Sequence, residues 1–459
     1  MIEFKGDGVM FKAEAVSKAY QVGDIEADVL RNISFHIDRG EFVSILGLSG
    51  CGKTTLLNIL AGIERCNIGS IRYEGEELCM FTDDQWTQWR RRHIGYIFQT
   101  FNLIDFMTAR DNVALAIRLN GTGSELRNKR AMELLALVGL EDKADYLPNQ
   151  LSGGQKQKVA IARALANNPD ILLADEPTGS VDSKTATEIM KMLRDINKQR
   201  KVTIIIATHN PKLAELADHR LSLVDGRIVA DELIKHKEEK TAKGTAALVL
   251  QQMLGTSVKG KMTFSSAVSL ALMNISTKRQ RTILTSMGAA IGVMGALLTF
   301  GIGFKTRTGI LAEEEQMLSN QTMISVTMML LTGISFIASG IMITLVTHMG
   351  IVERTKEIGI MKAIGFSEKD ILQVFTSEGG LMGLLAGVLG VVFASIFGMG
   401  INIFTRIVYP MIHISLYHVN GLQILFCIIL SMGVAIFCAY FPAKRASRMD
   451  PVESLGYIR

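Results

Sequence analysis

The chain has 459 residues, of which 48% are hydrophobic and 20% are charged, and its formal net charge is +5. This length is sufficient for at least two domains. The net charge is modest and the basic residues do not alternate with aromatic residues, so we expect no nucleic-acid partner. Charged residues are spread along the chain up to about residue 245, whereas long, almost uncharged apolar stretches begin near residue 282. The composition therefore predicts a soluble N-terminal part and a membrane-embedded C-terminal part.

Short apolar segments, typical of strands, organise the N-terminal part. They lie at residues 28–38, 41–46, 94–98, 171–174 and 202–207. Apolar residues at helical spacing predict a helix between the last two strands, namely Ala186, Ile189, Leu193 and Ile196. Strands that alternate with helices indicate a mainly parallel sheet, and a hairpin at Asp225-Gly226 ends the predicted α/β domain, residues 1–234. The N-terminus, MIEFKGDGVM, lacks the features of a secretory signal, so we expect this domain in the cytosol.

A glycine-rich loop follows the predicted strand at 41–46. Its sequence is Gly47-Leu48-Ser49-Gly50-Cys51-Gly52-Lys53-Thr54, and Thr55 continues it into an apolar helical repeat. Glycines let the backbone wrap around phosphates, while N–H groups and the helix N-terminus supply positive potential. We expect Lys53 to reach the outer phosphates and Thr54 to ligate Mg²⁺ through its hydroxyl. The loop, with Thr55, therefore predicts a binding site for ATP with Mg²⁺.

Two acidic residues, Asp175 and Glu176, end the predicted strand at 171–174. An acidic pair at a strand end is usually only part of a turn. Beside a phosphate-binding loop, however, Asp175 is placed to hold Mg²⁺ through water, and Glu176 to polarise the water that attacks the γ-phosphate. We therefore predict that Glu176 is the main catalytic residue of an ATPase.

The segment Leu151-Ser152-Gly153-Gly154-Gln155 precedes a predicted helix. Together with the motifs above, it resembles the signature of ATP-binding cassette (ABC) proteins. The resemblance implies an α/β phosphate-loop ABC ATPase fold in which this segment contacts the γ-phosphate held by a second copy, and hence a homodimer. It further implies roles for four residues that occur in family order: Tyr20 stacks on adenine, Gln99 senses Mg²⁺, Asp182 contacts the partner copy, and His209 is a catalytic γ-phosphate switch.

The C-terminal part is predicted to be an all-α membrane domain, residues 282–459. Its apolar stretches at 282–304, 322–349, 379–404 and 421–441 are long enough to be four transmembrane helices. Residues 235–262 are interpreted as a linker, and residues 263–281 as an amphipathic helix on the inner membrane surface, because Phe264, Val268, Leu272 and Ile275 form an apolar stripe. Basic residues are concentrated on the side that carries Lys278 and Arg354, which places this side in the cytosol. We therefore expect a multi-pass protein of the cytoplasmic (inner) membrane.

Three distant segments resemble one ABC family, the macrolide-exporter and lipoprotein-release (MacB-like, FtsX-type permease) group. They are Phe98-Gln99-Thr100-Phe101-Asn102-Leu103, the stretch from Glu353 to Gly365, and Pro442-Ala443-Lys444-Arg445-Ala446-Ser447-Arg448. The resemblance implies that residues 353–365 are a cytosolic coupling segment between the ATPase and the spans. Members of this group have a large extracytoplasmic domain between the first and second spans, whereas only residues 305–321 lie there in this chain. The short connection is either natural or the result of an excision.

These patterns favour ATP-driven export or extraction of a hydrophobic or amphiphilic substrate, such as an antimicrobial peptide, a drug or a lipid. An alternative is a mechanotransmission device that actuates an extracellular partner without transport, like the cell-division FtsEX pair. Short outer loops favour the pump, and any accessory protein is unknown. Haem efflux is a further alternative, because Tyr409, His413, Tyr417 and His418 lie in the second outer loop. Aromatic residues in such loops more often serve as interfacial anchors.

Overall fold

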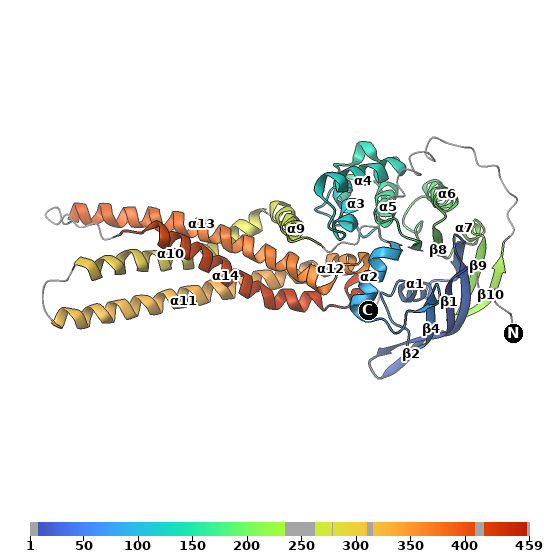
Figure 1. The fold of residues 1–459 in the computed structure, drawn as a ribbon, viewed down its shortest axis with the longest axis horizontal. Helices are drawn as coiled ribbons and strands as arrows, with labels where there is room; N and C mark the ends of the chain where they lie inside the picture. Colours follow the sequence, from blue (N-terminus) through green and yellow to red (C-terminus); the bar gives the residue numbers. More distant parts are fainter. Residues whose placement is uncertain (1–7, 235–261, 278, 310–314, 409–416, 457–459) are drawn as a thin grey trace. The chain divides into compact units, whose positions relative to one another are not determined.

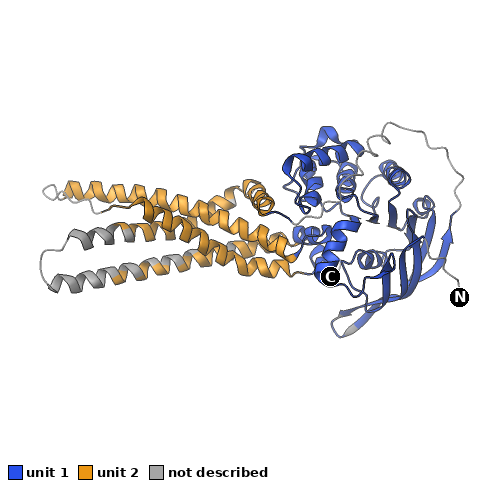
Figure 2. Cartoon of the chain, in the orientation of Figure 1, with its two compact units in different colours: residues 1–263, 356–367, 450–459 blue, residues 264–355, 368–449 orange. Residues whose placement is uncertain are grey.

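The computed structural model describes residues 8–234, 262–277, 279–309, 315–408 and 417–456. The chain forms two compact units (Figure 2). Unit 1 comprises residues 1–263, 356–367 and 450–459, and unit 2 comprises residues 264–355 and 368–449. The linker proposed for residues 235–262 lies, except for Met262, outside the described residues.

A six-stranded sheet is the centre of unit 1 (Figure 1). Its strands, in spatial order, are β10 (Arg227–Leu233), β9 (His219–Val224), β3 (Phe42–Leu46), β8 (Thr203–Thr208), β7 (Ile171–Asp175) and β6 (Ile94–Ile97). All neighbouring strands are parallel except the β9–β10 hairpin. Strands β7 and β8 are buried along their whole length, as expected for strands covered on both faces. The predicted α/β architecture is confirmed.

Unit 1 also contains a second, antiparallel sheet, which the sequence patterns did not predict. Its strands, in spatial order, are β2 (Ile25–Asp38), β1 (Val9–Val22), β4 (Ile68–Tyr73) and β5 (Glu76–Glu77). Only residues 28–38 of this sheet were recognised as a strand. The register between β1 and β2 shifts at several points, near Val16 for example. Each shift moves the apolar residues to the other face, so β1 lacks the simple alternation that reveals a strand.

Helices of unit 1 pack on the six-stranded sheet and on one another. They are α1 (Lys53–Leu60), α2 (Asp83–His93), α3 (Ala109–Arg118), α4 (Ser124–Leu137), α5 (Gly153–Ala164), α6 (Ser183–Arg200) and α7 (Pro211–Ala214), with short 3₁₀ segments at Glu141–Lys143 and Pro148–Gln150. Helix α6 is the one expected between β7 and β8, and it buries Ile189, Leu193 and Ile196 against the core. Helix α2 begins with a capping box formed by Thr82 and Gln85 and buries both tryptophans, Trp86 and Trp89.

A buried histidine connects three parts of unit 1. His219, at the start of β9, has its Nδ1 3.4 Å from Glu41 Oε1 and its Nε2 2.6 Å from Asp231 Oδ1 on β10. Burial alone would lower the pKa of His219. Hydrogen bonding to Glu41 and Asp231 and the charges of both carboxylates outweigh burial and raise this pKa above its ordinary value.

Two short helices from the C-terminal half of the sequence complete unit 1. They are α12 (Thr355–Ile364) and α15 (Pro451–Leu455). Ala363 of α12 and Val452 of α15 belong to the same apolar core as Trp86 and Trp89 of α2. Helix α12 ends at Gly365, which has φ +107° and whose carbonyl accepts hydrogen bonds from Nε and Nη2 of Arg91 at 3.1 and 2.9 Å. The segment predicted to couple the two parts is therefore packed into the ATPase-like unit.

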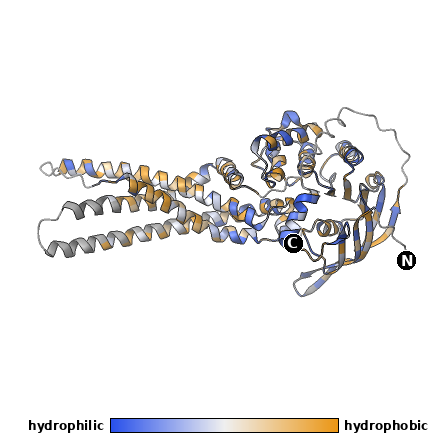
Figure 3. Ribbon diagram, viewed as in Figure 1, coloured by the Kyte–Doolittle hydropathy of each residue, from blue (hydrophilic) through white to orange (hydrophobic). Residues whose placement is uncertain are grey.

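Unit 2 consists of helices. They are α9 (Phe264–Thr277), α10 (Arg279–Gly309), α11 (Glu315–Glu353), α13 (Glu368–Val408) and α14 (Gly421–Ser447). Among the described residues, Thr282–Thr299, α13 and α14 are long and apolar enough to cross a membrane, and apolar residues predominate along α14 in Figure 3. The described apolar stretch of α11, Gly340–Glu353, is shorter, so the second of the four predicted spans stays a prediction.

Small residues allow the long helices of unit 2 to approach closely. A Cβ atom added at Gly379 or Gly383 of α13 would lie 2.5 Å from the methyl group of Ala439 or Ala435 of α14. Small residues at helix contacts are typical of membrane proteins, where close backbone packing replaces the hydrophobic effect. In α9, a face that includes Ala267, Leu270 and Asn274 is buried, whereas Phe264 and Leu272 of the predicted stripe are exposed. Two residues of the predicted stripe are thus exposed, and the location of this helix on a membrane surface stays a prediction.

Candidate nucleotide site

The phosphate-binding loop predicted from the sequence lies between β3 and α1. Gly50 and Gly52 have φ +83° and +102°, values that favour glycine, and a Cβ atom at Gly52 would lie 2.9 Å from the Val29 carbonyl oxygen. Lys53 is buried, and its Nζ donates hydrogen bonds to the carbonyl oxygens of Gly47 and Leu48, both at 2.9 Å. The loop therefore curls around the ammonium group at the N-terminus of α1. Ser49 is exposed in the loop, and Cys51 is buried.

The predicted Mg²⁺ ligands Thr54 and Asp175 meet at the end of the parallel sheet. Thr54 Oγ1 lies 3.0 and 2.9 Å from the two carboxylate oxygens of Asp175. Asp175 is 1% exposed, and burial is the main reason that its pKa is raised to about 6. A hydroxyl beside a buried carboxylate supplies the oxygen ligands that Mg²⁺ prefers, and a bound cation would neutralise the buried charge. The residues present therefore fit a Mg²⁺ site.

Glu176 is the point where the other predicted catalytic groups converge. It has φ +42°, an uncommon conformation for this residue type that projects it from the end of β7. Its Oε1 lies 3.5 Å from Lys53 Nζ, and its Oε2 lies 3.1 Å from His209 Nδ1, just after β8. Gln99, just after β6, has its Nε2 3.4 Å from the same Oε2. Residues from three distant parts of the sequence thus surround the Glu176 carboxylate.

Tyr20, predicted to stack on adenine, lies beside α1, the helix that follows the phosphate loop. Its hydroxyl donates a hydrogen bond to Glu64 Oε2 at 2.7 Å and lies 3.5 Å from Thr55 Oγ1 of α1. Glu64 also pairs with Lys18 at 3.0 Å. Burial is the main cause of a pKa of Tyr20 above its ordinary value, so its hydroxyl is a neutral donor. Glu64 was missed by the sequence analysis, because its position after α1 resembles an ordinary charged turn.

The signature segment and Asp182 lie together, at the starts of α5 and α6. Ser152 caps α5 in a reciprocal capping box with Gln155, and Asp182 caps α6 by accepting from the N–H groups of Lys184 and Thr185. A side-chain hydrogen bond from Thr185 is the main cause of a lowered pKa at Asp182.

Glycines bring the two helix starts into contact. A Cβ atom at Gly153 would lie 3.3 Å from the Ser180 carbonyl oxygen, and one at Gly154 would lie 2.5 Å from the Thr185 methyl group. Ser152, Gln155 and Asp182 form hydrogen bonds at their own helix starts. A second group gathers around the phosphate loop and Glu176 and consists of Lys53, Thr54, Gln99, Asp175 and His209. The predicted site residues thus form two groups within one chain.

The residues considered for haem binding are only partly described. Tyr409 and His413 lie outside the described residues. Tyr417 N donates to Asn402 Oδ1, and Asn402 Nδ2 donates to the Tyr417 carbonyl oxygen, both at 2.9 Å. The Tyr417 ring packs against Gly398 and Gly301. In the described part of the chain, Tyr417 therefore serves the packing of α10 and α13, and no cluster of three or more His, Cys, Asp or Glu residues suits a metal ion.

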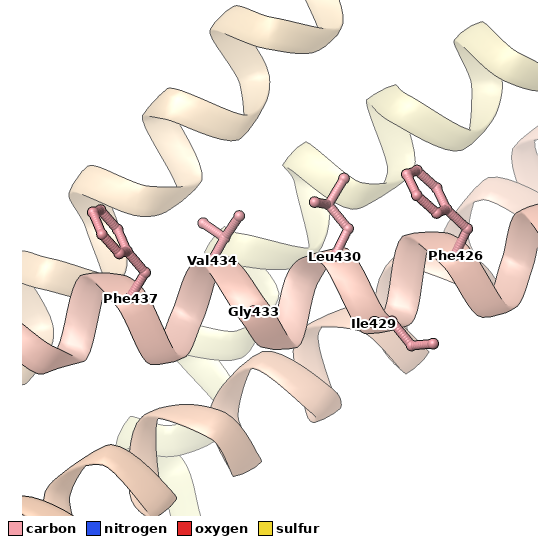
Figure 4. A pocket seen from close by; sticks show the side chains of 6 residues that line it. All are labelled: Phe426, Ile429, Leu430, Gly433, Val434 and Phe437. Carbon is pink, nitrogen blue, oxygen red and sulfur yellow. The ribbon is translucent and has the colours of Figure 1, made fainter.

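Unit 2 carries an apolar groove on α14 (Figure 4). The groove has a volume of about 380 Å³ and is lined by Phe426, Ile429, Leu430, Gly433, Val434 and Phe437. Figure 4 shows Phe426, Leu430, Val434 and Phe437 projecting from the same side of the helix. Val434 also lines a neighbouring hollow of about 460 Å³, together with residues of α11 that include Ile337 and Ile341. Both surfaces suit an apolar occupant.

Two family models match the chain, one in its N-terminal part and one in its C-terminal part. Residues 30–179 match the family model described as ABC transporter, and residues 329–451 match that described as FtsX-like permease C-terminal. The chain therefore combines an ABC transporter ATPase domain with an FtsX-like permease domain.

Among curated relatives, the chain is similar to the macrolide export ATP-binding/permease protein MacB of Bartonella henselae, with 38% identity over 67% of this chain and 47% of that protein. MacB of Salmonella typhimurium is also 38% identical, over 66% of this chain and 46% of that protein. The chain thus spans about half the length of the curated relatives that it matches. A solved dimeric ATP-binding cassette, MJ0796 in a post-hydrolysis state bound to ADP and Pi, is 41% identical with a TM-score of 0.47, covering 50% of this chain and all of that one.

Proposed function

We propose that this protein is an ATP-driven exporter or extractor of hydrophobic or amphiphilic substrates in the cytoplasmic membrane. The observation that carries the proposal is the position of α12. This helix is packed into the core of the ATPase unit, yet the chain continues from it directly into α11 on one side and α13 on the other. Movement of the ATPase unit therefore has a covalent route to the permease helices.

The groups around Glu176 support ATP hydrolysis. Glu176 is placed to accept a proton from an attacking water, and His209 and Gln99 hold its Oε2 in position. Lys53 would neutralise charge on the outer phosphates, as in other phosphate-loop enzymes. Mg²⁺, held by Thr54, Asp175 and Gln99, would supply further charge neutralisation at the phosphates.

Two copies are proposed to complete each ATP site. Within one chain, the phosphate loop lies with Tyr20 and Thr55, whereas Ser152, Gly153, Gly154, Gln155 and Asp182 lie at the helix starts of α5 and α6. The N-terminus of a helix attracts phosphate through its free N–H groups. The start of α5 in one copy would thus bind the γ-phosphate held by the loop of the other, and the homodimer would contain two ATPase domains and eight spans.

The apolar surface of unit 2 supports a hydrophobic or amphiphilic substrate class. The two hollows on α11 and α14 are lined almost entirely by aliphatic and aromatic side chains. A charge within a membrane span usually marks a polar pathway, and these surfaces contain none among their lining residues. The curated relatives are named as macrolide export proteins.

The test is ATPase stimulation in proteoliposomes. Purified full-length protein is titrated with a macrolide antibiotic, a cationic amphipathic peptide and a lysophospholipid, and Glu176→Gln protein reports background hydrolysis. We expect at least one amphiphile to stimulate hydrolysis saturably. Transport is then measured for that amphiphile. If no amphiphile stimulates, and hydrolysis instead responds only to an added extracellular protein, the mechanotransmission alternative replaces the pump.

A further inference from the structure

A buried ionic cluster connects three helices of unit 2. Arg354 follows α11, and its Nη2 donates to both carboxylate oxygens of Glu378 in α13, each at 2.8 Å. Asn274 of α9 donates from Nδ2 to Glu378 Oε1, also at 2.8 Å. All three side chains are buried, and the Arg354 guanidinium also lies over the Phe375 ring, 5.1 Å from its centroid. The cluster thus has partners on α9, on α13 and at the end of α11.

The energetics of burial indicate a role other than stability. Removing two charges from water is costly, and a buried ion pair is often no more stabilising than an apolar pair of similar volume. The cluster is also incompletely satisfied, because among the described residues Asn274 Oδ1 has no hydrogen-bond partner. What the ion pair supplies is a directional link: two short charged hydrogen bonds fix where α13 lies relative to the end of α11.

The two charged residues lie on either side of α12 in the sequence. Arg354 immediately precedes α12 and Glu378 lies beyond it, inside α13. The ion pair joins residues 24 positions apart and so closes a loop that contains all of α12. Without the pair, a pull on α12 could separate α11 from α13 at their α12 ends. With the ion pair formed, the same pull displaces α11 and α13 together, and Asn274 extends the connection to α9.

We infer that Arg354, Glu378 and Asn274 form an ionic clamp that makes α9, α11 and α13 move together when α12 is displaced. These are positioning residues, since they act through α12 and touch neither nucleotide nor substrate. The inference rests on the proposed function, in which α12 transmits ATP-driven motion. It adds that transmission requires the charge of the clamp, and that hydrolysis itself does not.

The experiment measures the distance between α11 and α13 by pulsed electron resonance. Spin labels are attached at Val352→Cys and Gln373→Cys, two exposed positions beside the clamp. The partly exposed Cys66, Cys79 and Cys438 are replaced first, while the buried Cys51 and Cys427 are kept. The protein is studied as the full chain in lipid nanodiscs, without nucleotide and with ATP trapped by Glu176→Gln. We expect one narrow distribution of distances that is the same in both states. In Glu378→Gln protein, we expect a broader distribution that shifts when ATP binds.

Two further variants isolate the charge. Arg354→Gln combined with Glu378→Gln leaves no uncompensated buried charge, so it folds even where the single variant does not, and its distribution should also be broad. Glu368→Gln makes the same chemical change at an exposed position on the same helix and should behave as the parent. With Glu176 restored, the clamp variants should keep basal hydrolysis. Amphiphile stimulation should fall by about tenfold, which lies within the typical range of coupling between two sites.

Each outcome decides the inference. A parental, narrow distribution in both clamp variants would overturn it, as would a parent in which ATP itself separates the two labels. If no amphiphile stimulates the parent while the clamp variants still broaden the distribution, the proposed transport function fails but the ionic clamp is upheld. The distance measurement therefore separates the two failures.

Discussion

Replacing Gly365 by alanine should detach α12 from the ATPase unit without touching the ATP site. Gly365 has φ +107°, so any other residue is strained by about 1–3 kcal/mol. The new Cβ atom would also lie 3.0, 3.1 and 3.2 Å from Cβ, Cα and N of Arg91, atoms that cannot rotate away. Relief of this contact requires the end of α12 to move, and movement weakens the two hydrogen bonds from the Arg91 guanidinium, which together contribute about 1.5–3 kcal/mol.

The combined cost is about 2.5–6 kcal/mol when both hydrogen bonds are lost, which corresponds to about a 60- to 20,000-fold change in the docking equilibrium of α12. Hydrogen exchange measured by mass spectrometry over residues 355–364 in nanodiscs should therefore accelerate strongly. Amphiphile stimulation should be lost while basal hydrolysis persists. Gly123→Ala is the matched control, because Gly123 has a negative φ and open space around its Cβ position. Parental exchange rates and stimulation in Gly365→Ala protein would refute the reasoning.

Three further outcomes are expected. Glu176→Gln should reduce turnover by about 10²- to 10⁴-fold, as loss of a general base does, while bound ATP, measured with a fluorescent analogue, is retained; turnover close to that of the parent would remove Glu176 from catalysis. Mixed dimers of Lys53→Ala and Ser152→Ala chains carry one composite site with both lesions and one with neither, so crosslinked mixed dimers should hydrolyse ATP where either pure dimer does not. His219 has a raised pKa in the folded chain, so its contribution to stability is fully present below its unfolded pKa of about 6.5 and is lost as the pH rises through the higher folded value. The difference in unfolding temperature between parent and His219→Gln, followed by fluorescence of the two tryptophans of unit 1, should therefore shrink from acidic to alkaline pH.

The nucleotide site was largely predictable because its residues lie in short, continuous motifs. The strand, glycine loop and helix that hold Lys53 and Thr54 are consecutive in sequence, and so are the strand and acids that end at Glu176. Carboxyl ends of neighbouring parallel strands meet at one edge of a sheet. Gln99 and His209 were assigned to the site by the family resemblance, and the structure brings them to the ends of β6 and β8, beside Asp175 at the end of β7.

Contacts between distant segments were not predictable in the same way. Glu64 binds Tyr20 across 44 positions, and Arg91 binds Gly365 across 274. A single charged residue carries no sign of its partner, and its usual role is solvation. The pairing of Arg354 with Glu378 was hidden for a related reason. Arg354 was interpreted as a marker of orientation and as part of the coupling segment, and Glu378, just before a predicted span, carried no signal of its own.

The discontinuity of unit 1 has a consequence for how the protein is made. Ala363 and Val452 fill its apolar core, but the ribosome adds them only after the helices α9 to α11 and, for Val452, α13 and α14 have emerged. Until then the nascent ATPase domain exposes the apolar surface that these residues will cover. Exposed apolar surface of this kind promotes aggregation and is bound by chaperones. Completion of the ATPase core therefore depends on segments that are synthesised after the first long helices of unit 2. A cassette produced without residues 356–456 would expose to water the apolar surface that Ala363 and Val452 cover in the complete unit.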